Sequence, residues 1–120
     1  MCVVAQHKDV LTIEKTGTYR GLYHVLGGTV SPLEGRRLDD LHALELVRRV
    51  EAGTIREILL ALNPTPEGAM TRAYLLRLLE THPVAVTTIA VGIPMGGALE
   101  HADEATVAGA LTGKQVLRAA

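Results

Sequence analysis

The residues best placed for chemistry lie in one short segment, Asn63 to Gly68 (NPTPEG). Thr65 can cap a helix that begins at Pro66, because proline is favoured in the first helical turn. The free N–H groups of a helix N-terminus attract anions, so the segment could form an anion or metal corner that includes Glu67. It could also be a turn stiffened by its prolines and closed by the threonine cap. The spacing alone favours the turn.

Two glycine-rich segments could approach a phosphate group. Gly92 to Gly97 (GIPMGG) lacks the Gly-Lys-Ser/Thr ending of a P-loop, and no long helix follows it at once. Gly113-Lys114-Gln115 fails the same test, because glutamine has no hydroxyl for magnesium. We interpret both segments as turns.

The remaining candidate groups have weaker spacing. The histidines, at positions 7, 24, 42, 82 and 101, form no pair with metal-ligand spacing, and His24 falls in a predicted strand, where packing or hydrogen bonding is its expected role. An acidic cluster beside His101 could hold a cation, although a solvated helix start is the simpler interpretation; it consists of Glu100, Asp103 and Glu104. Two arginine pairs could meet a phosphate or a protein partner, but surface charge is favoured. These pairs are Arg36-Arg37 and Arg48-Arg49.

Strand and helix patterns alternate along the chain and predict an α/β fold, with a mostly parallel sheet of about four strands and helices on both faces. Open parallel sheets bind ligands beyond the carboxyl ends of their strands, where Asn63 to Gly68 would lie. Short apolar runs predict the strands, and apolar periodicity predicts the helices, the first capped by Asp9. The strands are 2–5, 19–26, 55–62 and 84–91, and the helices are 10–16, 38–50, 66–80 and 104–111.

Composition excludes several classes of protein. The 120 residues carry a net charge of −1, with no Trp or Phe and three Tyr, so binding of DNA through charge or base stacking is not expected. One cysteine, Cys2, excludes an internal disulfide and a cysteine zinc site. No apolar run is long enough to span a membrane, and no secretion signal is visible, so we expect a cytoplasmic protein. Because the first strand begins at residue 2, we expect a domain from a longer chain or a shortened form of a protein.

Several blocks, taken in order, resemble the recombination mediator family RecR over nearly the whole chain. They are YRGLYHVLGG (19–28), LEG (33–35), LALNPTPEG (60–68), GIPMGGALEHADE (92–104) and ALTG (110–113). The resemblance implies a Toprim-type fold over residues 1–91 and a Walker-B-like C-terminal segment over 92–120. In this family that segment packs on, or is exchanged with, a neighbouring subunit. Ala105, Val107, Ala108 and Leu111 would then form the apolar contact of a homodimer.

The same resemblance bears on catalysis. Toprim enzymes hold Mg²⁺ with one Glu after the first strand and an Asp-x-Asp after the third. The matching positions here are Ala5, Asn63 and Thr65, and only the nearby acid Glu67 remains. The family match therefore implies no enzyme activity, metal or cofactor. It implies instead that Glu67, Asn63 and Thr65 bind RecO-like and RecF-like proteins.

The sequence also departs from the family pattern and leaves other functions open. The helix-hairpin-helix and four-cysteine zinc modules of the family are absent from these residues, so any contact with DNA should be weak or indirect. Ala5 and Lys8 differ from what the family usually has in the first loop. A small metal-dependent phosphotransfer enzyme or nuclease is one alternative. A stable engineered or reconstructed scaffold without a partner is the other.

Overall fold

A computed structural model describes all residues from 1 to 120. The chain forms two compact units, Met1–Ile89 and Ala90–Ala120, which are described separately. The first unit contains the sheet and three of the helices. The second contains one further helix and the C-terminal segment.

The sheet of the first unit has four parallel strands in the order β2-β1-β3-β4, so the predicted α/β fold class is confirmed. The strands are β1 (Cys2–Val4), β2 (Tyr23–Val25), β3 (Glu57–Leu60) and β4 (Ala85–Thr88). All four are shorter than their apolar runs. The pairing of β3 with β1, for example, extends only one residue past Leu60, where the Ala61 N–H donates to the Val3 carbonyl at 2.9 Å.

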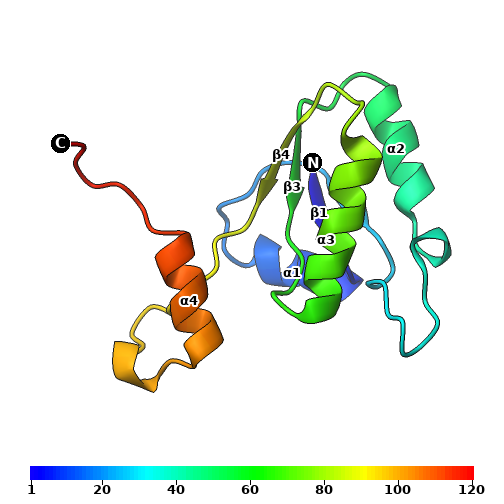
Figure 1. Ribbon diagram of the computed structural model, residues 1–120. Helices are drawn as coiled ribbons and strands as arrows, with labels where there is room; N and C mark the ends of the chain where they lie inside the picture. The colour runs from blue at the N-terminus through cyan, green and yellow to red at the C-terminus, as the bar shows by residue number, and fades with distance from the viewer. The chain divides into compact units, whose positions relative to one another are not determined.

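Helices lie on both faces of this sheet (Figure 1). The connection from β1 to β2 runs in the opposite direction to the connections from β2 to β3 and from β3 to β4. With right-handed crossovers, α1 (His7–Glu14) lies on one face, and α2 (Ala43–Glu51) and α3 (Pro66–Leu79) lie side by side on the other.

The core fills the space between the sheet and the pair α2 and α3. Alternate residues of β1 and β3 point towards these helices, because successive side chains of a strand lie on opposite faces. No residue of helix α1 is itself buried, and the main core cluster lies on the side of α2 and α3. The buried residues of the cluster are Val3, Ala5, Leu26, Ala43, Leu46, Val50, Ile58, Leu60, Leu62, Leu75 and Leu79.

Two predicted helix starts were wrong. Helix α1 begins three residues early: Gln6 occupies the N-cap position, and Asp9 lies at the third helical position, where its Oδ2 accepts from the Gln6 N–H at 2.9 Å. The predicted helix 38–50 is divided into a 3₁₀ turn, η1 (Leu38–Asp40), and α2. The break follows from tertiary structure, because the His42 N–H donates to the Leu26 carbonyl at 3.0 Å.

The second unit contains a 3₁₀ turn, η2 (Leu99–His101), and helix α4 (Glu104–Thr112). Asp103 caps α4 by accepting from the Thr106 N–H at 2.7 Å, which lowers the pKa of its carboxyl group. This confirms the helix-start interpretation of the acidic cluster. No residue of α4 is buried, although the helix is mostly apolar.

Candidate functional site

The Asn63 to Gly68 segment, interpreted from its spacing as a turn, forms a corner at the carboxyl ends of β1 and β3. These two strands are adjacent and parallel, with Val3 opposite Leu60, so Ala5 and Asn63 leave the sheet at the same edge. Ala5 is 6% exposed and belongs to the core. Its side chain therefore packs against apolar neighbours and has no group for a metal or a proton.

The Thr65 cap and a close backbone approach shape this corner. The Gly68 N–H donates to Thr65 Oγ1 at 3.0 Å, as the sequence predicted. A Cβ atom at Gly68 would overlap the carbonyl oxygen of Asn63. Only glycine lets the loop after β3 lie so close to the first turn of α3.

The three residues predicted to bind a partner lie within this corner. Asn63 and Thr65 are exposed, and Glu67 is half-buried in the first turn of α3. A carboxylate is favourable there because the N-terminus of a helix carries partial positive charge. No group of three or more His, Cys, Asp or Glu is arranged to hold a metal ion. The corner thus offers one carboxylate among neutral side chains.

Next to the corner, the loop after β2 is bound to α3 through Thr71. Thr71 is fully buried; its Oγ1 accepts from the Val30 N–H at 2.9 Å and donates to the Glu67 carbonyl at 2.7 Å. These two bonds hold residues 30–32 against the first half of α3. Between the loop and the helix lies a pocket of about 430 Å³.

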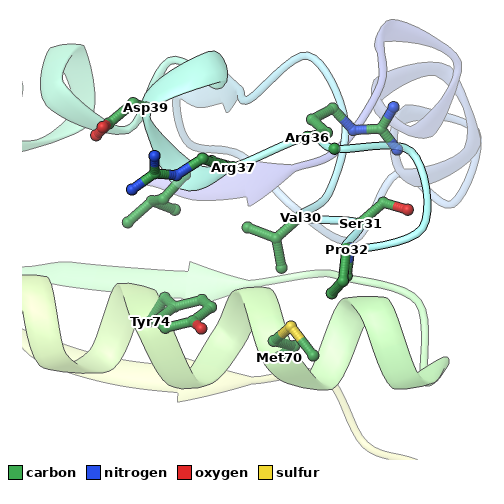
Figure 2. Close-up of a pocket in the computed structure, with 10 residues that line it drawn as sticks. Val30, Ser31, Pro32, Arg36, Arg37, Asp39, Met70 and Tyr74 are labelled. Atoms are coloured by element: carbon green, nitrogen blue, oxygen red, sulfur yellow. The ribbon is translucent and has the colours of Figure 1, made fainter.

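The sequence did not reveal this pocket. Met70 and Tyr74 project into it from α3, and Val30 and Pro32 face them from the loop (Figure 2). The other lining residues are Ser31, Gly35, Arg36, Arg37, Leu38 and Asp39. The sequence indicates only a turn region for this loop, because its partner Thr71 lies 41 residues away from Val30 in the chain.

One arginine of each pair has a different role from the expected surface charge, while Arg37 and Arg48 are exposed. Arg36 binds its own loop, donating to the Thr29 carbonyl and, from Nη1, to Glu34 at 2.8 Å. Arg49 is half-buried and donates to the carbonyl of Tyr23 in β2. The surface-charge interpretation was therefore wrong for Arg36 and Arg49, and both stabilise the fold.

The residues predicted for self-association lie on α4 of the second unit. Ala105, Ala108 and Leu111 are exposed, at a three-residue spacing that places them on one side of the helix. Val107 is half-buried within the unit. Leu111 is 67% exposed, which leaves a large apolar side chain without cover.

Comparison with known proteins identifies the family of this chain. The family model for the Toprim domain matches residues 1–90, and the model for the RecR C-terminal region matches residues 92–115. The chain belongs to the RecR family of Toprim proteins. The family resemblance of the sequence blocks is thus confirmed.

Individual relatives agree with the family match. The "Recombination protein RecR" of Chlorobium chlorochromatii is 52% identical over 120 residues, which cover 98% of this chain and 59% of the relative. That of Leifsonia xyli subsp. xyli is 50% identical over 115 residues, covering 96% of this chain and 58% of the relative. The chain therefore spans just under three fifths of the length of these RecR relatives. No helix is long and apolar enough to cross a membrane.

Proposed function

We propose that this chain is the non-catalytic Toprim part of a RecR-type recombination mediator, which acts in recombinational DNA repair by binding RecO-like and RecF-like proteins. The observation that supports this best is the corner at the start of α3. Glu67 is there, half-buried, beside the neutral side chains of Asn63 and Thr65 and at the same sheet edge as the buried Ala5. The relatives' name, recombination protein, supports the repair role.

The chemistry of the corner supports binding rather than catalysis. Mg²⁺ that carries out phosphotransfer is held by several hard oxygen ligands, usually including more than one carboxylate. Glu67 alone supplies one, and Ala5 supplies none. A single carboxylate at a helix start is well suited to accept an arginine or lysine from another protein.

Calorimetric titration of the full chain with a RecO protein tests this function. We expect binding to RecO, no measurable binding to DNA alone, and at least a five-fold weaker affinity for RecO in Glu67→Gln. Glu104→Gln is the matched control, because Glu104 also lies in the first turn of a helix, α4, and is exposed. This control should leave RecO affinity unchanged.

Three outcomes would contradict the proposal in different ways. Absence of RecO binding by the wild-type chain would overturn the partner assignment. Equal RecO affinity of Glu67→Gln and wild type would remove Glu67 from the interface. Cleavage of DNA in Mg²⁺ or Mn²⁺ that Glu67→Gln abolishes would overturn the non-catalytic assignment.

We also propose that α4 mediates self-association into a homodimer. Three of its apolar side chains, Ala105, Ala108 and Leu111, are exposed within the second unit, and an exposed apolar surface of this kind commonly marks a protein interface. The partner binding of the first unit and the association of the second are separate properties and are tested separately.

A further inference from the structure

Glu67, Met70 and Tyr74 lie on one face of α3. Spacings of three and four residues place side chains above one another along a helix. Met70 and Tyr74 form the apolar floor of the pocket beside α3, and Glu67 precedes Met70 by about one turn and Tyr74 by about two. The candidate partner-binding carboxylate and the pocket are therefore neighbours on a single helix face.

Arg37 supplies the opposite charge at the other end of this face. Its guanidinium lies over Tyr74 across the pocket (Figure 2). Arg36 already contacts Glu34, whereas no carboxylate lies within ion-pair distance of the Arg37 side chain. The Asp39 carboxylate also lines the pocket, and Figure 2 shows it directed away from Met70 and Tyr74.

The pocket has an apolar floor that is open to a ligand. Tyr74 is 44% exposed and Met70 is 37% exposed, although both lie beside the loop that Thr71 holds in place. Covering this floor with an apolar side chain favours binding, because it removes apolar surface from water. Its opposite charges, Glu67 at one end and Arg37 at the other, would select what flanks that side chain.

We propose that this surface binds an extended segment of a partner protein in which one basic and one acidic side chain flank a large apolar side chain. The apolar side chain enters the pocket, the basic one meets Glu67 and the acidic one meets Arg37. This inference rests on the proposed function, because it specifies the chemistry of the partner that binds beside Glu67.

The dimensions agree with a segment of this kind. The helix rises about 10 Å from Glu67 to Tyr74, at ~1.5 Å per residue. Alternate side chains of an extended segment lie on one side, and three of them span about 13 Å at ~3.3 Å per residue. Flexible lysine, arginine, aspartate and glutamate side chains readily take up the remaining difference.

Methionine-methyl NMR on the full chain provides the test, because the chain has only three methionines, and Met70 alone lines the pocket. The probe is a synthetic peptide with lysine, leucine and glutamate at alternate positions, separated by serines. We expect the Met70 signal to shift on titration, while Met1 and Met95 stay unchanged. Replacing the leucine of the peptide with serine should abolish the shift.

Reversing the charge at the Arg37 end of the surface tests the proposed charge pairing. The Arg37→Glu variant should bind this peptide at least five-fold more weakly than the wild type does. The same variant should bind a peptide with lysine at both ends more tightly than the wild type does. Arg72→Glu is the control, since Arg72 is an exposed residue of α3 that does not line the pocket.

Truncations separate this inference from the proposed function. Tyr74→Ala should weaken RecO binding at least five-fold, and Leu76→Ala should not, although Leu76 is equally exposed, at 45% against 44%. If Glu67→Gln weakens RecO binding and Tyr74→Ala does not, the pocket inference is overturned and the proposed function stands.

In the NMR titration, a Met70 shift without RecO binding supports the pocket and overturns the proposed partner. Absence of a Met70 shift, or an equal shift with the serine peptide, overturns the pocket.

Discussion

Arg49 of α2 donates from Nη1 to Nδ1 of His24 in β2 at 3.1 Å. The same nitrogen also donates to the Tyr23 carbonyl at 2.8 Å. Because Nδ1 accepts, the imidazole carries its proton on Nε2, which donates to the His42 carbonyl at 2.7 Å. A neutral histidine of one tautomer thus joins the edge strand β2 to α2 and to the residue that precedes this helix.

This arrangement makes folding stability depend on pH. Burial lowers the pKa of His24 below its ordinary value of 6.5; the charges of Arg49 and His42 also lower it, while the bond to the His42 carbonyl and the charge of Glu45 oppose them. Below about pH 6.5 the unfolded chain therefore binds more protons than the folded chain, and the free energy of unfolding falls as the pH falls. One such group contributes at most about 1.4 kcal/mol per pH unit.

Urea denaturation at several pH values between 5 and 8 measures this dependence. We expect His24→Gln to be less stable than the wild type at pH 8 and to show a smaller loss of stability on going to pH 5. His7→Gln, which changes an exposed histidine of α1, should retain the wild-type slope. An unchanged slope in His24→Gln would show that other groups cause the acid sensitivity.

Thr71 gives the second prediction, because its hydroxyl is the acceptor for the buried Val30 N–H. Thr71→Val keeps the shape but removes that acceptor, and an unpaired buried N–H costs about 1–3 kcal/mol. Thr71→Ser keeps the hydroxyl. We therefore expect hydrogen exchange at the Val30 amide to accelerate strongly in Thr71→Val and to stay slow in Thr71→Ser. Equally fast exchange in the two variants would mean that the hydroxyl does not hold the pocket loop.

Local chemistry explains what the sequence predicted well. The start of α3 depends on Thr65, Pro66 and the Gly68 N–H, which are within four residues of one another. The fold class followed from alternating strand and helix patterns, each visible within a short window. The corner with Glu67 is therefore predictable from the residues that form it.

Long-range contacts explain what the sequence did not predict. The break before α2 depends on a bond from His42 to Leu26, and the pocket depends on a bond from Val30 to Thr71. The role of Arg49 depends on β2, about 25 residues earlier in the chain. None of these pairs has a signal in local periodicity or capping, so the pocket and the buried arginine appear only in three dimensions.

Gly68 and Gly109 are both helical glycines, and they should respond to alanine in opposite ways. A Cβ at Gly68 would overlap the Asn63 carbonyl oxygen, whereas at Gly109 the nearest atom, Val91 Cγ2, is 4.0 Å away. We expect Gly68→Ala to lower the free energy of unfolding by about 1–3 kcal/mol. Gly109→Ala should be neutral or stabilising by up to about 1 kcal/mol, since alanine favours helix. Circular dichroism during denaturation measures both, and an unaltered stability of Gly68→Ala would contradict the close approach.

Leu111 provides the last prediction, on self-association through α4. A lysine at this exposed position would place a charge in an apolar interface, where no carboxylate of α4 other than Glu104 is available to pair with it. We expect the wild-type chain to sediment as a dimer and Leu111→Lys to sediment as a monomer with its helical content retained. Leu11→Lys on α1 is the matched control, because Leu11 is 64% exposed and Leu111 is 67% exposed. A wild-type chain that stays monomeric over a broad range of concentration would contradict association through α4.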